Sequence, residues 1–240
     1  MSQRVNSFDQ PIGPALLEWR APPRPARTVL EGRFCRVEPL DVGRHARPLY
    51  DANSLDLEGR MWTYLFSGPF GSFDEYRDWL TPKESSEDPL FFAFVDRDRG
   101  QAVGLGSYLR IDAAHGVVEV GHLAFSPLMQ RSPVATEAMY LMMRNAFELG
   151  FRRYEWKCDA LNAASRRAAE RLGFTFEGIF RQAIVYKGRN RDTAWFSIID
   201  HEWPVLDAAF RAWLDPSNFD ADGQQQASLA TLRERCRGNV

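Results

Sequence analysis

The sequence is poor in the residues that carry redox, metal and thiol chemistry. Its 240 residues include three cysteines and four histidines. Cys35, Cys158 and Cys236 are odd in number and lack metal-ligand spacing, which favours free thiols in a reducing cytoplasm over a disulfide framework. Cys158 occupies an apolar strand position, so we interpret it as a buried, inert thiol. His122, next to Gly121, has no visible partner in the sequence and is expected to be structural.

Long apolar runs and a strong charge of either sign are also missing. No run approaches the ~20 apolar residues of a membrane span, and the first residues lack the apolar core of a signal peptide. The net charge is −2, so no overall field favours nucleic acid or an anionic membrane as a partner. We therefore expect a cytoplasmic protein that binds neither nucleic acid nor membrane.

Several familiar catalytic signatures are absent as well. There is no Gly-x-Ser-x-Gly elbow, no Walker-type Gly-Lys-Ser/Thr loop, no His-Glu-x-x-His and no paired-cysteine site. These absences leave hydrolase, nucleotide-hydrolysing and zinc-dependent classes without support, and we predict no metal.

Three segments differ in composition. Residues 1–27 are rich in proline without a sustained period, and they are expected to form an extended arm. Residues 28–214 alternate between strand and helix patterns and are long enough to bury one substantial core. Residues 215–240 are expected to be a polar tail with a short helix at Leu229–Arg235.

The middle segment predicts an α+β fold. Strands are expected at Val29–Pro39, Leu90–Val95, Ala102–Ile111, Val117–Phe125, Arg153–Cys158, Phe174–Tyr186 and Thr193–Ile199. Helices are expected from the Asp41 cap to about Leu55, and at Phe73–Lys83, Pro133–Leu149, Asn162–Leu172 and Glu202–Leu214. This order indicates a central, mixed, mostly antiparallel sheet with helices on both faces. In the helix over 133–149, Glu137 and Tyr140 are expected opposite the buried apolar side.

A strand, a polar turn and a helix start follow one another over residues 116–138. The strand breaks at Ser126-Pro127, and the turn Gln130-Arg-Ser-Pro133 leads into the helix. Free amides at a helix N-terminus, reinforced by the helix dipole, suit a pyrophosphate. Groups that could serve it are the amides of Ser132, Val134, Ala135 and Thr136 and the side chain of Arg131. Alternatively, Ser132-Pro133 is only a favourable helix start.

This stretch resembles the acetyl-CoA motif of the GNAT acetyltransferases, and within them the RimJ/RimL-like branch. The family pattern is Gln or Arg, two residues, Gly, one residue, then Gly or Ala; here it reads Gln130-Arg-Ser-Pro133-Val-Ala135. Pro133 replaces the central glycine and has no N–H to donate. A second block, Asn162-Ala-Ala-Ser165 followed by Leu172-Gly-Phe174, is similar to the family's Asn-x-x-Ser and Leu-Gly-Phe segment. The resemblance covers roughly residues 28–202.

The resemblance implies a GNAT fold whose sheet is splayed in the middle, and direct acetyl transfer from acetyl-CoA to an amine. The strand 117–125 would part from the next strand near Phe125 and leave an amide free to bind the thioester oxygen. Asn162 and Ser165 would lie along the pantetheine arm, although helix capping alone would favour these residue types. Ser165, or Tyr186 if it turns inward, would protonate the departing thiolate.

Glu119 is the candidate general base. By strand alternation it shares a face with Val117, Leu123 and Phe125. A carboxylate among apolar neighbours has a raised pKa, which suits a base, and the resemblance implies a glutamate on this strand that serves the amine. The alternative is a structural salt bridge with Lys157 or Arg153.

The acceptor is a primary amine, and the resemblance favours a protein or peptide N-terminus. A small amine such as an antibiotic is an alternative, and Pro133 keeps open a degenerate fold that binds coenzyme A or a peptide without turnover. In relatives an aromatic loop lines the acceptor cleft; here that loop contains Trp62, Tyr64, Phe66 and Phe70, which could equally be core. The cationic tip Lys187–Asp192 is expected to be solvated, or to meet an acidic substrate or the partner subunit of a homodimer.

Overall fold

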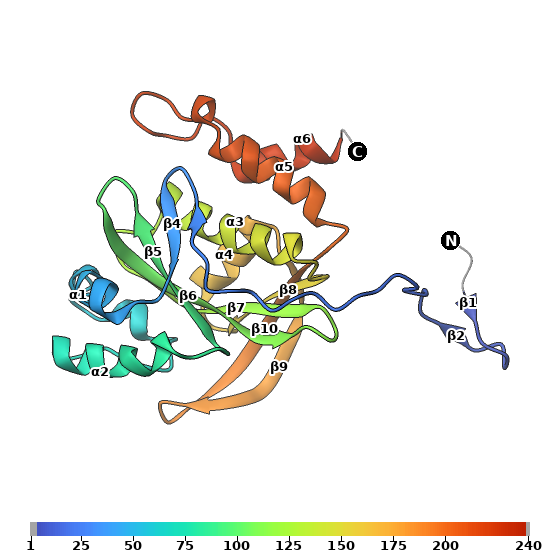
Figure 1. Ribbon diagram of the computed structural model, residues 1–240, viewed down its shortest axis with the longest axis horizontal. Helices are drawn as coiled ribbons and strands as arrows, with labels where there is room; N and C mark the ends of the chain where they lie inside the picture. The colour runs from blue at the N-terminus through green and yellow to red at the C-terminus, as the bar shows by residue number, and fades with distance from the viewer. Residues whose placement is uncertain (1–3, 239–240) are drawn as a thin grey trace.

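A computed structural model describes residues 4–238 of the chain, and an eight-stranded sheet forms its centre (Figure 1). The strand order is β3-β4-β5-β6-β7-β8-β10-β9, and β7 with β8 is the parallel pair. The strands are β3 (Leu30–Glu31), β4 (Cys35–Pro39), β5 (Leu90–Asp96), β6 (Gln101–Asp112), β7 (Val117–Phe125), β8 (Arg153–Asp159), β9 (Thr175–Tyr186) and β10 (Arg189–Ile199). The predicted mixed, mostly antiparallel sheet is confirmed.

Helices cover both faces of this sheet, as predicted (Figure 1). They are α1 (Val42–Asn53), α2 (Phe73–Glu84), α3 (Pro133–Glu148), α4 (Ala163–Leu172), α5 (Trp203–Leu214) and α6 (Leu229–Arg237). The cap residues set where the helices begin: Asp41 and Ser72 each accept the amide of the residue three positions on. In the part of the chain that the structure describes, no helix is long and apolar enough to cross a membrane.

Two apolar clusters lie on opposite sides of the sheet. The larger is shared between the sheet, α3, α4 and α5, and includes Phe92, Met142 and Phe196. The smaller lies between the sheet, α1 and α2, and includes Leu49 and Leu80. Each helix layer therefore buries its own apolar face against the sheet, and together they hold the central strands in place.

Glu137 corrects the predicted polar face of α3. It is 3% exposed, and Tyr140 is buried beside it. The Glu137 carboxylate accepts three backbone amides, at 2.6–2.8 Å, from Arg33, Phe34 and Cys35. A Cβ at Gly32 would lie 2.4 Å from this carboxylate. Glu137 thus fastens α3 to the turn between β3 and β4, a tertiary role that helical periodicity does not reveal.

The two ends of the chain behave differently. The N-terminal arm carries a small hairpin, β1 (Arg4–Val5) with β2 (Pro11–Ile12), away from the main sheet (Figure 1). Trp19 fixes the arm to the body by donating its indole N–H to the carbonyl of Ala114 at 3.4 Å. At the other end, the expected short helix is present as α6, which packs against α5.

The sheet opens between β7 and β8. The parallel pairing runs from Val117 with Arg153 to Val120 with Trp156 and then ends, whereas β6 and β7 stay paired as far as Phe125. The predicted splay is therefore present and begins at Gly121, four residues before Phe125. This opening positions the site described below.

Candidate active site

A β-bulge at His122 changes which residues of β7 face the opening. Gly121 pairs with Ser107 and Ala124 with Leu105, so two residues, His122 and Leu123, stand opposite one. His122 has φ of 50°, which absorbs the extra residue. The expected alternation is therefore wrong beyond Gly121. Leu123 and Phe125 pack against the cluster under α3, whereas Glu119 shares its face with Gly121 and with His122, which contacts Ser107 and Phe91.

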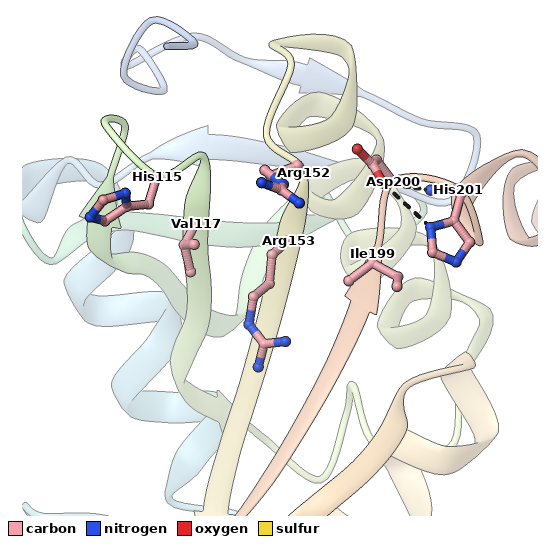
Figure 2. Close-up of a pocket in the computed structure, with 7 residues that line it drawn as sticks. All are labelled: His115, Val117, Arg152, Arg153, Ile199, Asp200 and His201. Atoms are coloured by element: carbon pink, nitrogen blue, oxygen red, sulfur yellow. Dashed lines mark hydrogen bonds and ion pairs between the residues drawn. The ribbon is translucent and has the colours of Figure 1, made fainter. Parts of the chain in front are cut away.

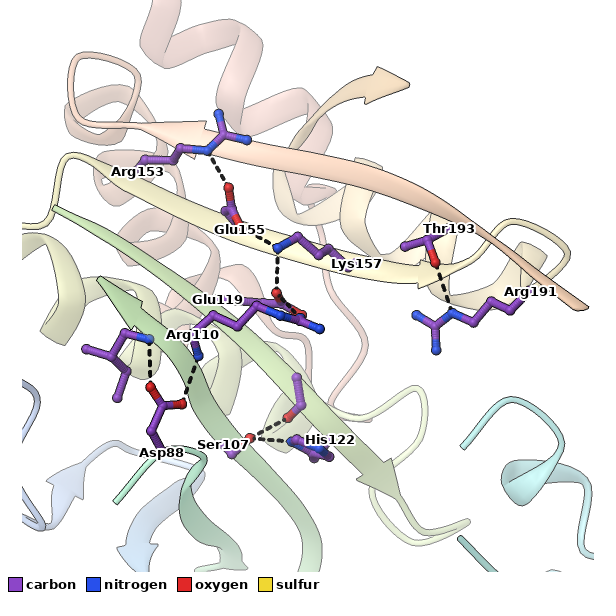
Figure 3. Close-up of polar contacts among 12 residues, drawn as sticks. Asp88, Ser107, Arg110, Glu119, His122, Arg153, Glu155, Lys157, Arg191 and Thr193 are labelled. Atoms are coloured by element: carbon purple, nitrogen blue, oxygen red, sulfur yellow. Dashed lines mark hydrogen bonds and ion pairs between the residues drawn. The ribbon is translucent and has the colours of Figure 1, made fainter. Parts of the chain in front are cut away.

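Glu119 lies in a buried network of charges rather than among apolar side chains (Figure 3). Its Oε2 contacts Nη1 of Arg110 at 2.6 Å and Nζ of Lys157 at 2.8 Å. Lys157 also contacts Glu155 at 2.7 Å and lies over the ring of Trp195 at 3.8 Å. The salt bridge weighed as an alternative is present with Lys157, and it fixes the direction in which the Glu119 carboxylate points.

His122, expected to lack a partner, is held by Ser107. The Ser107 hydroxyl donates to the carbonyl of Gly121 at 3.3 Å and contacts His122 Nδ1 at 2.9 Å. Which of the two groups donates in the Ser107–His122 contact depends on the imidazole tautomer. Burial lowers the pKa of His122 to about 4, and the charges of Lys83 and Arg110 add to this effect. The imidazole is therefore neutral at neutral pH.

The turn before α3 has the capped start that the sequence predicts. The Ser132 hydroxyl accepts the amide of Ala135 at 3.4 Å and donates to the carbonyl of Met129 at 2.6 Å. Pro133 occupies the first helical position, and the amide of Val134 precedes the first intrahelical bond. Arg131 is exposed, with φ of 58°. The Arg131 side chain and the amide of Val134 are therefore the groups of this turn that the helix itself does not use.

The side chains of two other residues predicted at this turn are hydrogen-bonded within the chain. Gln130 donates its side-chain amide to the carbonyl of Phe125 at 2.8 Å, which ties the turn to the end of β7. Thr136 is buried, and its hydroxyl accepts a hydrogen bond from Nη1 of Arg171 at 3.1 Å. These hydrogen bonds join the turn to the end of β7 and the first turn of α3 to the end of α4.

The start of α4 lies across the opening. Asn162 caps this helix by accepting the amide of Ser165 at 3.0 Å, as capping chemistry alone predicts. The Ser165 hydroxyl accepts the indole N–H of Trp156 at 3.0 Å. Trp156 is the last residue of β8 paired with β7, so Ser165 lies directly beside the point where the strands part. Cys158, farther along β8, is buried, and burial raises the pKa of its thiol.

Tyr186 turns inward at the end of β9. Its side chain is 6% exposed, and its hydroxyl donates to Oδ2 of Asp159 at 2.8 Å. Burial, followed by the hydrogen bond to Asp159, raises the pKa of Tyr186. Phe66 packs against the Tyr186 ring with centroids 5.5 Å apart.

The aromatic loop divides between core and cleft. Trp62 is buried, and it packs with Phe70 and Trp79 in the cluster under α1 and α2. Tyr64 instead reaches the start of α4, where its hydroxyl donates to the carbonyl of Leu161 at 3.2 Å. Phe66 is half-exposed against the β9–β10 hairpin. The loop therefore spans from the smaller core to the opening of the sheet.

Known proteins match this arrangement of strands and helices. The model of the Acetyltransferase (GNAT) domain matches residues 42–175, more than half of the chain. The crystal structure of a GCN5-related N-acetyltransferase from Brucella melitensis is 49% identical, has a TM-score of 0.89, and covers 91% of this chain and 100% of its own. The chain belongs to the GNAT family.

Other solved structures share this GNAT fold. A GNAT-family protein from Chromobacterium violaceum ATCC 12472 is 41% identical, with a TM-score of 0.76, over 81% of this chain and 98% of its own. The ribosomal L7/L12 α-N-protein acetyltransferase RimL, solved with coenzyme A, is 18% identical over 72% of this chain and 99% of its own, with a TM-score of 0.61. That likeness is one of fold. Comparison with curated protein sequences gives no match.

Membership of the family makes this chain an acetyltransferase that uses acetyl-CoA as its donor. Across residues 4–238, no group of three His, Cys, Asp or Glu side chains is arranged to hold a metal ion.

A hollow of about 300 Å³ (Figure 2) is lined by residues at the start of β7 and β8 and the end of β10. It lies at the end of the sheet opposite to the opening, so it is separate from the GNAT site.

Proposed function

We propose that this GNAT protein is RimJ/RimL-like and transfers the acetyl group of acetyl-CoA to the α-amino group of a protein or peptide N-terminus, in the cytoplasm. The observation that carries the proposal is the opening between β7 and β8, which begins at Gly121. The start of α3, the start of α4 and the charged face of the sheet converge there. Donor and acceptor can therefore meet at one unpaired strand edge.

Acetyl-CoA would lie across the start of α3 and into the opening. Its pyrophosphate would accept a hydrogen bond from the amide of Val134, with Arg131 close by. Its pantetheine arm would run along the free edge of β7, past Asn162. An amide between Gly121 and Phe125 would donate to the thioester oxygen, and such a donor stabilises the developing oxyanion by about 2.7–4 kcal/mol in comparable sites.

Proton transfers complete the reaction. Glu119 would accept the amine proton, directly or through water, while Arg110 and Lys157 keep its carboxylate in place. Ser165 would donate to the departing thiolate, and its oxygen accepts the indole N–H of Trp156. Tyr186 is the other candidate, and its hydroxyl already donates to Asp159.

The test is acetyl transfer to a panel of acceptors. Release of the coenzyme A thiol is measured with short peptides bearing free N-termini, the same peptides with blocked N-termini, and small polyamines and aminoglycosides. We expect turnover only with free peptide N-termini. Turnover of small amines alone would assign the chain to small-molecule acetylation. If acetyl-CoA binds but none of these acceptors reacts, the proposal of a peptide N-terminus as acceptor is wrong.

A further inference from the structure

The hairpin between β9 and β10 turns more tightly than its sequence suggests. The sequence favours a solvated tip over Lys187–Asp192, but the turn consists of Lys187 and Gly188, with φ of 47° and 69°. Positive φ at both positions is the geometry of a two-residue hairpin turn, and β10 begins at Arg189, opposite Tyr186. The hairpin is present, but its turn is two residues long instead of the expected six, and Arg191 lies within the strand.

Two of the three cations between Lys187 and Arg191 are bound to the aromatic loop. Lys187 Nζ donates to carbonyl oxygens at 2.9, 3.1 and 2.9 Å, those of Trp62, Ser67 and Gly68. Arg189 Nη2 donates to the carbonyl of Thr63 at 2.7 Å. These bonds use Lys187 and Arg189 to hold the loop against the hairpin.

Arg191 is the third cation, and its charge has no counter-ion. It is 7% exposed, and its Nε donates to the Thr193 hydroxyl at 3.2 Å. Within residues 4–238, no carboxylate oxygen lies within the 4.0 Å of an ion pair with it. The guanidinium instead lies over Phe66 and Tyr186, 5.3 and 5.9 Å from the ring centroids. Within the described residues, its Nη atoms donate no hydrogen bond, and Nε makes the one to Thr193.

A buried guanidinium without a counter-ion is costly, and contact with aromatic rings recovers only part of that cost. The planar fork of arginine matches the two oxygens of a carboxylate. The nearby Asp159 does not fill this role, because its carboxylate accepts the Tyr186 hydroxyl and the amide of Leu161. Its negative charge also disfavours a dianionic phosphate more than a carboxylate.

Arg191 lies on the same face of the sheet as Glu119. Thr193 is opposite Asp159 and Trp195 opposite Lys157, so these side chains share one face. Figure 3 shows the Arg191 side chain running back along β10 toward Thr193. Its guanidinium therefore points toward the end of the opening where the amine would react.

We propose that Arg191 binds a carboxylate of the acceptor, an inference that rests on the proposed function. Arg191 is hydrogen-bonded to Thr193, and Thr193 lies opposite Asp159. Asp159 lies three residues beyond Trp156, where the opening begins, and three strand residues span about 10 Å. The carboxylate of a free amino acid lies too close to its amine for this span. An aspartate at the second or third residue of an extended peptide reaches it. The substrate is therefore an N-terminus followed closely by an acidic residue.

The test uses pentapeptides whose other side chains are uncharged and in which Asp or Asn is placed at each of positions 1–4. The ratio of kcat/KM for each Asp and Asn pair is measured at saturating acetyl-CoA for the natural protein, Arg191→Gln and Arg191→Lys. Arg181→Gln is the matched control, because it removes an exposed cation from the same hairpin. Melting temperatures verify that each variant is folded.

We expect the natural protein and Arg181→Gln to prefer Asp over Asn by at least about tenfold at position 2 or 3. Arg191→Gln should lower that ratio to about one, and Arg191→Lys should keep part of it. A ratio near one in the natural protein, or a preference that survives Arg191→Gln, overturns the proposal. If no peptide is acetylated, the proposed function fails, and calorimetric binding of the Asp and Asn peptides to the coenzyme A complex decides on Arg191.

Discussion

The Glu119 carboxylate lies between the guanidinium of Arg110 and the ammonium of Lys157, and this pairing sets what its replacement should do. If Glu119 accepts the amine proton, Glu119→Gln should lower kcat by about 10²–10⁴-fold, the usual range for a lost general base. The loss should shrink at high pH, where the amine deprotonates without help. The KM for acetyl-CoA should not change. Steady-state kinetics between pH 6.5 and 9.5 measure all three effects.

Arg110→Gln is the matched control, because it removes the exposed partner of Glu119 and keeps the carboxylate. We expect its kcat to stay within about tenfold of the natural value. Full activity of Glu119→Gln at neutral pH would make the glutamate structural. His122, on the same face of the sheet and neutral at neutral pH, would then be the next candidate.

His122 makes stability depend on pH in a defined direction. Its pKa is about 4 in the folded protein and near 6.5 when unfolded. Between these values the unfolded chain binds a proton that the folded protein does not, so this contribution is complete above pH 6.5 and is lost as the pH falls to 4. The shift corresponds to at most about 3 kcal/mol.

The measurement compares urea unfolding of the natural protein and His122→Gln from pH 7 to pH 4. Other groups also titrate in this range, including His45, whose pKa burial lowers, but they contribute to both proteins. The natural protein should lose more stability than the variant over this range. Parallel losses in the two proteins would show that His122 titrates normally.

At the scale of elements, the sequence predicted those features that depend on residues close together in the chain. The caps at Asp41 and Ser72 and the start of α3 appear in the structure, as does the alternation of β7 as far as Gly121. The bulge at His122 was missed because two residues opposite one is a property of strand pairing, which the sequence of β7 alone does not encode. The burial of Glu137 was missed for the same reason, since its partners lie about a hundred residues away.

The same distinction applies to the candidate site. The two GNAT-like blocks lie on the predicted elements, beside one opening, because motif spacing follows element order. The face of Glu119 depended on the register between β6 and β7, and the burial of Arg191 depended on the length of a turn. Both are set by tertiary pairing, so alternation and charge counting alone did not predict them.

Substitution of Pro133 tests how the start of α3 contributes to coenzyme A binding and to stability. It occupies the first position of α3, where a missing N–H costs the helix nothing. Pro133→Gly should return one amide to the phosphate site and lower the stability of the fold by about 1 kcal/mol through backbone entropy. Binding of coenzyme A, measured by calorimetry, should be unchanged or tighter.

Pro133→Ala separates the two effects, because it also restores the amide but without the entropy of glycine. We expect it to bind coenzyme A as Pro133→Gly does and to be the more stable of the two. Collapse of binding in both variants would mean that the proline ring itself holds the turn in its binding conformation.

At the scale of the whole molecule, donor binding should stabilise the complete fold. The turn at residues 130–136, the free edge of β7 and the start of α4 belong to different elements, so a ligand across them favours the folded state alone. At a hundredfold excess over its Kd, a ligand contributes about 2.7 kcal/mol, and for a domain of this size each kcal/mol raises Tm by roughly 2–4 °C. Acetyl-CoA should therefore raise Tm by about 5–10 °C.

The location of this effect is tested by reversing charge at the turn. Val134 is buried, so an acidic residue there would disturb the fold; Arg131→Glu combined with Pro133→Glu places negative charge against the phosphates without entering the core. This double variant should keep its own Tm within a few degrees and lose the acetyl-CoA shift. Arg152→Glu reverses a charge at the opposite end of the sheet (Figure 2) and should keep the shift. An unshifted natural protein at millimolar acetyl-CoA would contradict donor binding, and a shift retained by the double variant would place the pyrophosphate away from α3.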